Sequence, residues 1–151
     1  MNLLREVIPI QVVISIRLSI FIKTVIMKTH QREILIYYNP TSSSDRKTIA
    51  YAQGAGLHVK SYAFARSPST STSWKQILQA LDVHPRELMN KAHPYYQQHI
   101  RGRDFDDESW IKVIQNNPDL IKSPIAVRGR HAILCQTPTD IYKLANQFKS
   151  R

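Results

Sequence analysis

The strongest constraint on the fold is an unbroken strand, loop and helix start in the segment ILIYYNPTSSSDRKT, residues 34–48. The aromatic and β-branched run over 33–38 predicts a buried strand that ends at Asn39 and Pro40, a turn signal. Helical spacing over 45–55, followed by glycines, predicts a helix. The run HVKSYAFA, residues 58–65, predicts a second strand, so the segment opens a βαβ unit.

A helical pattern then replaces the strand pattern. The polar linker over 66–73 ends in serines that can cap a helix beginning at Trp74, and a second helix is expected at His84 and Pro85. The acidic cluster DFDDE, residues 104–108, opens a third helix; acids there favour a helix N-terminus rather than a metal site. We therefore expect an all-helical insert over about 73–122.

The last third of the chain predicts two strands and a helix. Residues 124–127 and 131–136 form the arms of a hairpin around Arg128, Gly129 and Arg130. A final helix is expected after the segment Thr137-Pro138-Thr139. The expected element order is βαβ, helical insert, ββα.

Charge and cysteine content limit the functional classes. The net charge of +10 favours encounter with acidic surfaces, but the densest basic cluster, residues 128–131, lacks the interleaved aromatics of a nucleic-acid platform. Cys135 is the single cysteine, which excludes an intrachain disulfide, fits a reducing cytoplasm and, in its apolar run, indicates a buried small hydrophobe. The histidines show no metal-ligand spacing, so no metal is expected.

The first 26 residues differ from the remainder. Residues 1–26 are apolar, but Arg5, Arg17 and Lys23 interrupt them, so they predict neither a spanning helix nor a signal peptide. Met27 has the context of an ordinary start directly before the first strand. We expect an N-terminal extension over 1–26, outside a single domain over 27–151; the alternative is a membrane-surface anchor.

The element order and three sequence segments together resemble those of a known protein family. The segments YYNPTSSSDRKT, DFDDESWIKVIQNNPDLIKSPIAV and ILCQTPTDI resemble the thioredoxin-like arsenate reductase (ArsC) family, which includes the Spx-type regulators of RNA polymerase. The resemblance implies an α/β thioredoxin-like fold, with a mixed four-stranded sheet, flanking helices and an all-helical insert. In the family a strand ends in Asn-Pro-x-Cys, and a cis proline faces the cysteine. Asn39, Pro40 and Pro124 match these positions.

The same resemblance exposes departures from the family chemistry. It places Ser42 where the family has its nucleophilic cysteine, and places Asn90, Ser123 and Gln136 where the family has arsenate-binding arginines. Arg46 matches the arginine that follows the cysteine. An alcohol is barely ionised near neutral pH and cannot form a disulfide.

Two functions follow from these departures. The first is a catalytically degenerate binding or regulatory module that contacts an acidic protein surface such as RNA polymerase. The alternative is an arsenate or disulfide reductase linked to glutaredoxin, with glutathione as co-substrate and no other cofactor. For the first, an anion or peptide site is expected around Asn39, Thr41, Ser43, Ser44, Arg46 and Pro124, although the loop also fits a capped helix start without a ligand. Substituting Ser42 by cysteine should give an acidic thiol with little arsenate turnover.

Overall fold

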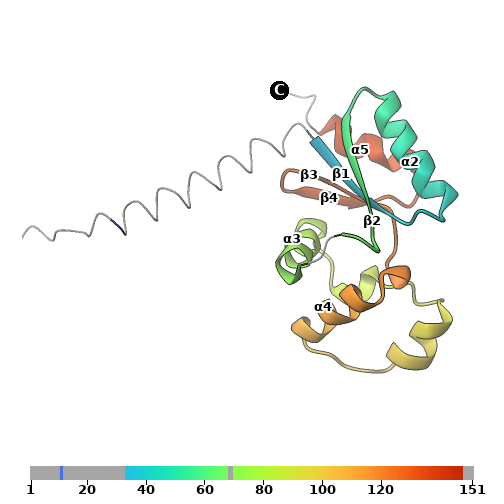
Figure 1. Cartoon of the computed structure of the whole chain (residues 1–151), viewed down its shortest axis with the longest axis vertical. Coiled ribbons are helices and arrows are strands. Elements are labelled where there is room, and N and C mark those ends of the chain that lie inside the picture. The colour runs from blue at the N-terminus through green and yellow to red at the C-terminus, as the bar shows by residue number, and fades with distance from the viewer. Residues whose placement is uncertain (1–10, 12–32, 68–69, 148–151) are drawn as a thin grey trace, which may run out of the picture.

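The computed structural model describes residue 11 and residues 33–67 and 70–147 of the chain, so almost all of the predicted extension over 1–26 lies outside the described residues. The strands are β1 (Glu33–Tyr38), β2 (His58–Ala63), β3 (Ile125–Arg128) and β4 (His131–Leu134), and the α-helices are α2 (Ser43–Gly54), α3 (Ser71–Leu81), α4 (Asp107–Asn116) and α5 (Ile141–Asn146). Short helical turns complete the order: η1 (Pro85–Leu88), η2 (Tyr96–Ile100), η3 (Pro118–Leu120) and η4 (Pro138–Asp140). Figure 1 shows these elements along the chain.

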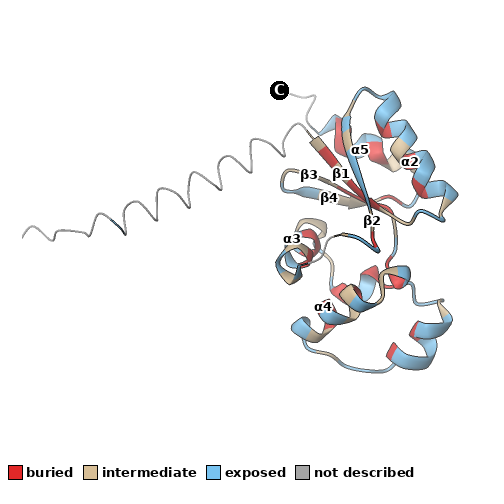
Figure 2. Ribbon diagram, in the orientation of Figure 1, coloured by how far each residue is buried: buried red, intermediate tan, exposed pale blue. Residues whose placement is uncertain are grey.

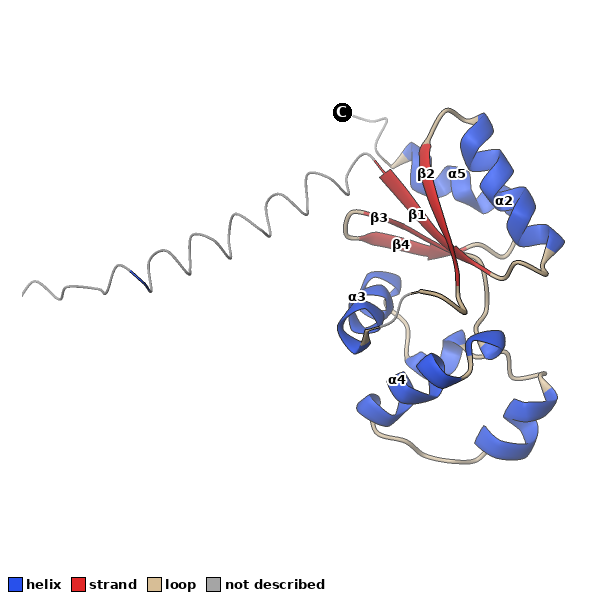
Figure 3. Ribbon diagram, in the orientation of Figure 1, coloured by secondary structure: helices blue, strands red, loops and turns tan. Residues whose placement is uncertain are grey.

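The four strands form one mixed sheet in the order β2-β1-β3-β4 (Figure 3). β1 runs parallel to β2, with Ile36 opposite Ser61, and antiparallel to β3, with Ile36 opposite Ala126. β3 and β4 form the antiparallel hairpin that the sequence predicts. The expected α/β fold with a mixed four-stranded sheet is therefore confirmed.

Helices cover both faces of the sheet, because successive residues of β1 point to opposite sides. Ile34 and Ile36 face α2 and α5, where they pack with Ala52, Ile141 and Leu144. Tyr37 faces the other side and joins the larger hydrophobic cluster. Figure 2 shows buried residues along β1 and on α2, α3 and α5.

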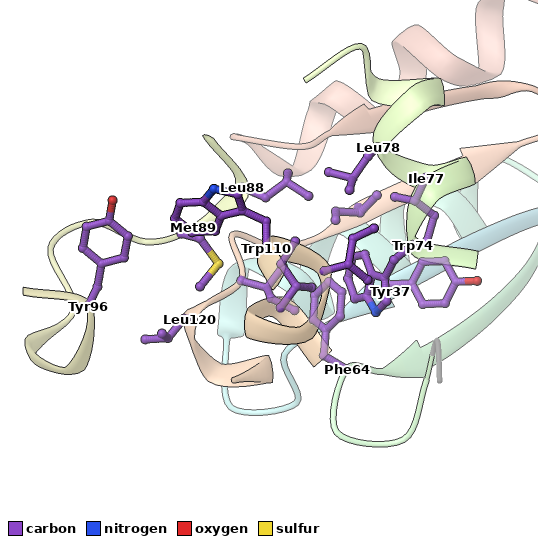
Figure 4. Packing of buried hydrophobic residues seen from close by; sticks show 14 of the residues in the cluster. Tyr37, Phe64, Trp74, Ile77, Leu78, Leu88, Met89, Tyr96, Trp110 and Leu120 are labelled. Atoms are coloured by element: carbon purple, nitrogen blue, oxygen red, sulfur yellow. The ribbon is translucent and has the colours of Figure 1, made fainter. Parts of the chain in front are cut away.

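The larger cluster joins the sheet to the helical insert. Trp74 of α3 and Trp110 of α4 are 1% and 2% exposed, and both belong to this cluster. Figure 4 shows Trp74 beside Phe64 and Tyr37, with Leu88 and Met89 farther into the insert. The insert is thus packed on the sheet through a continuous apolar core.

Three local expectations differ from the structure. α2 begins at Ser43, two residues earlier than expected, because Ser42 caps it. α3 is capped by Thr70, whose hydroxyl accepts the Ser73 N–H, so the serines expected as caps lie inside the helix. The helix expected at Pro85 is only the four-residue turn η1, since Met89 is already extended.

Two short helical turns of the described chain, η2 and η3, were not predicted. The turn η2, Tyr96–Ile100, is a short π-helix. Its sequence, YQQHI, has two apolar residues four apart, too few to give a periodic signal. Tyr96 and Ile100 are both buried and anchor it in the core of the insert.

Candidate functional site

The polar segment over residues 39–44, called the serine loop below, leads from β1 into the first turn of α2. Ser42 is the N-cap residue of α2. The Ser42 Oγ accepts the backbone N–H of Asp45 at 3.2 Å and donates its own proton to Oδ1 of Asp45 at 2.7 Å. This reciprocal pair satisfies a free donor in the first helical turn. The Ser42 hydroxyl therefore has both a donor and an acceptor within the loop.

Asp45 is the central residue of this loop. It is only 2% exposed, and its Oδ2 accepts the backbone N–H of Asn39 at 2.8 Å. The carboxylate thus joins the end of β1 to the start of α2. The Ser-x-x-Asp spacing, which is close to a capping box, is the sequence signal for this pairing with Ser42.

The outer side of the loop is held by a second set of hydrogen bonds. Asn39 Oδ1 accepts both the N–H and the hydroxyl of Thr41, at 3.0 and 2.8 Å. Arg46 Nη1 donates to the carbonyl oxygen of Pro40 at 2.6 Å. The guanidinium therefore lies over the loop, and Ser43 and Ser44 are exposed at the start of α2. The structure brings these predicted residues together.

Pro124, the remaining predicted site residue, is buried directly before β3. Its peptide bond with Ser123 is cis, as the resemblance implied. Its carbonyl oxygen accepts the Cys135 N–H at 3.0 Å. The hydrogen bonds of the described residues thus link Pro124 to Cys135 rather than to the serine loop.

Cys135 follows β4 and is 2% exposed. Burial, and then the charges of Asp140 and Asp45, raise the pKa of its thiol to about 12. The thiol is therefore protonated at neutral pH and a poor nucleophile. The charge of Asp45 acts on the thiol, which places Cys135 near the start of α2.

The three positions that the resemblance assigns to arsenate-binding arginines carry no charge. Asn90 is exposed in the insert, and its N–H donates to the Leu120 carbonyl at 2.7 Å. Ser123 is half-buried before the cis bond, and Gln136 is exposed after Cys135. An oxyanion at the serine loop would therefore have Arg46 as its cation from the family set.

The serine loop contains no thiol, and the Asp45 carboxylate would also destabilise a thiolate placed at position 42. A thiolate at a helix N-terminus is stabilised by free N–H groups, whereas a carboxylate at hydrogen-bond distance from the same side chain repels it. Asp45 supplies such a carboxylate to position 42. The acidity expected of a cysteine there stays a prediction, and it depends on the balance between the helix start and the Asp45 carboxylate.

Within the described ranges, no group of three or more His, Cys, Asp and Glu side chains is arranged to hold a metal ion. A helix with the length and apolarity needed to cross a membrane is likewise missing from the part of the chain that the structure describes.

Comparison with known proteins decides the family. The sequence model of the ArsC family matches residues 37–144, more than half of the chain, and includes the serine loop, the insert and the hairpin. The chain belongs to the ArsC family.

Similar ArsC-family proteins carry the name arsenate reductase. The chain is 27% identical to one from Yersinia enterocolitica, over 72% of this chain and 77% of that protein. It is 22% identical to one from Rhizobium meliloti, with the same two coverages of 72% and 77%. An arsenate reductase structure from Vibrio cholerae has the same fold, with a TM-score of 0.68 at 22% identity, over 74% of this chain and 97% of that one.

Proposed function

We propose that this ArsC-family chain is a catalytically degenerate binding or regulatory module. One observation carries the proposal: the side chain at position 42 is an alcohol whose proton is donated to Asp45. A serine nucleophile requires a general base that is free to take its proton and a site for the reacting group. The Asp45 carboxylate is buried and also accepts the Asn39 N–H, so it serves as a structural acceptor.

The single cysteine, Cys135, is also a poor candidate for a nucleophile. Cys135 is buried, and its raised pKa, about 12, leaves almost no thiolate near neutral pH. Neither position 42 nor Cys135 therefore supplies the attacking thiolate that disulfide exchange requires.

For the partner we propose an acidic protein surface, such as that of RNA polymerase, in the cytoplasm. The net charge of +10 supports long-range attraction to such a surface. The docking site that we propose is the serine loop, where Arg46 and the exposed Ser43 and Ser44 can meet an acidic side chain or peptide terminus. Asn39 and Thr41 belong to the same proposed site and shape it through their hydrogen bonds.

Interferometry with the full chain and purified RNA polymerase tests the partner. We expect saturable binding that weakens with added salt, and a loss of about tenfold for Arg46→Glu, because the reversed charge repels the acidic partner. Lys47→Glu, one residue along α2 and equally exposed, is the matched control and should change binding less. Equal effects of the two variants would contradict docking at the serine loop, and absence of binding would contradict this partner.

One finding favours the alternative, a glutathione- and glutaredoxin-linked reductase: the similar ArsC-family proteins carry the name arsenate reductase. Fold does not by itself transfer a reaction to a chain with different site residues. The two candidates differ in one measurable quantity, the turnover of arsenate or a disulfide by the full chain.

A further inference from the structure

We propose that the helical insert binds a small molecule through a phosphate monoester group, in a pocket separate from the serine loop. The pocket has a volume of about 500 Å³ and lies in the stretch 84–101, around η1 and η2. Its formally charged lining residues are three cations and one carboxylate: Arg86, Lys91, Arg101 and Glu87. The lining is therefore suited to an anion. This site is independent of the function proposed above.

Gln97 of the π-helix holds the Arg101 guanidinium and the backbone of Lys91. Its side-chain amide donates to the backbone carbonyl of Lys91 at 2.5 Å, and its Oε1 accepts from Arg101 Nη1 at 2.8 Å. The Lys91 ammonium has no hydrogen-bond partner among the described residues. One neutral side chain thus orients a lysine segment and an arginine, and leaves the ammonium available to a ligand.

Tyr96 positions the third cation. It is 3% exposed, and its hydroxyl oxygen accepts from Arg86 Nε at 3.5 Å. Figure 4 shows the ring at the edge of the hydrophobic cluster, with the hydroxyl turned away from Leu120. The phenol proton and the terminal nitrogens of Arg86 are free to donate within the described residues. A guanidinium beside a hydroxyl donor matches the geometry of phosphate oxygens.

The backbone of this stretch is fixed from two sides. Met89 and Ile121 form an isolated antiparallel bridge, and beside it the Lys122 N–H donates to the Leu88 carbonyl at 2.8 Å. The buried side chains of η2 anchor the other end. Such π-turns often occur at functional sites. A pocket with a fixed backbone loses less entropy when a ligand binds, which favours affinity.

Size and charge define the ligand class. Small-molecule pockets typically measure about 300–1,000 Å³, so inorganic phosphate would fill only a small part of this one. An ester with an organic group uses the remaining space. Glu87, the acidic lining residue, repels a second anionic group and so disfavours extended polyanions.

The test is an NMR titration of the full chain with glycerol 3-phosphate, inorganic phosphate and glycerol as separate probes. We expect saturable shifts of the Gln97 side-chain amide and of the Nε–H signals of Arg86 and Arg101. Arg101→Gln and Lys91→Gln should each weaken the ester affinity by about tenfold, the effect of one charge-assisted hydrogen bond. Lys112→Gln, an exposed lysine of α4 outside the pocket, is the control and should bind like the wild type.

Four results would overturn the proposal. Inorganic phosphate that binds as tightly as the ester would remove the role of the organic group. Unchanged affinity in both pocket variants, with wild-type circular dichroism, would remove the role of the cations. Shifts confined to the serine loop would place the anion at the start of α2 instead. Glycerol alone should cause no saturable shift, and saturation by glycerol would contradict recognition through phosphate.

Discussion

A cysteine placed at position 42 should have a thiol pKa that Asp45 keeps high. In the wild type the Ser42 Oγ and Asp45 Oδ1 lie 2.7 Å apart, so a sulfur there would lie about 4 Å or less from the carboxylate. At that distance two negative charges repel by about 1 kcal/mol in water and about 4 kcal/mol near a protein surface. Since one pKa unit corresponds to about 1.36 kcal/mol, the carboxylate raises the thiol pKa by roughly 1–3 units.

The helix start acts in the opposite direction, because helix N-termini lower cysteine pKa values to about 3.5–7.5. We therefore expect the Ser42→Cys thiol to have a pKa roughly 1–3 units above the value that the helix start alone would give. Adding Asp45→Asn, which removes the charge and keeps the shape, should lower that pKa by at least about 1 unit. Adding Asp107→Asn, a first-turn acid of α4, is the matched control and should leave the pKa unchanged.

The assay is the pH dependence of iodoacetamide alkylation at residue 42, followed by mass spectrometry of the labelled peptide. Cys135 should not interfere, because it is buried and has a pKa of about 12. A thiol pKa below about 7.5 in Ser42→Cys, unchanged by Asp45→Asn, would refute the reasoning. It would mean that the helix start outweighs the carboxylate and that Asp45 does not control the chemistry of position 42.

Three further predictions concern stability and reactivity. Asp45→Ala leaves two donors, the Asn39 N–H and the Ser42 hydroxyl, without their acceptor. It should lower the free energy of unfolding, measured in urea, by about 2–4 kcal/mol, whereas the control Asp107→Ala should lower it by less than about 0.5 kcal/mol. Equal losses in the two variants would contradict a structural role for Asp45. Cys135 should resist alkylation in the native chain at pH 8 and react fully after unfolding in urea, whereas rapid native labelling would contradict its burial. The Lys143 ammonium and then the Thr137 N–H lower the pKa of Asp140 to about 2, so its stabilising contribution is complete above the unfolded pKa of about 4 and is lost as pH falls through about 2. Asp140→Asn should flatten the fall of the urea midpoint in that window, and an unchanged pH profile would contradict this assignment.

The sequence predicts the sheet and most helices of this chain well, because their patterns are local and strong. The predicted strand over 33–38 matches β1 to the residue, since an apolar run is followed by Asn39 and Pro40. The cap of α4 is also close to the prediction: Asp106 accepts the Ser109 N–H at 2.8 Å, and bonds from Ser109 lower the pKa of Asp106. Where the pattern is short, as in η1 and η2, the prediction overestimates or misses the element.

The candidate site is less predictable, because its chemistry depends on burial and on contacts between distant segments. The sequence places Ser42 and Asp45 three residues apart but does not show that Asp45 is 2% exposed. Nor does it show that Asp45 acts on Cys135, about ninety residues later, since that requires α2 to pack against the segment that follows β4, including η4. The insert pocket depends on a π-turn whose sequence carries no helical periodicity.

The central claim is that this ArsC-family chain lacks a reactive nucleophile, and turnover tests it most directly. The measurement is glutathione- and glutaredoxin-coupled reduction of arsenate and of a small disulfide by the full chain, beside Ser42→Ala and Cys135→Ala. The account predicts no turnover above background for any of the three proteins. Turnover by the wild type that either substitution abolishes would contradict it and identify that residue as the active group of a reductase.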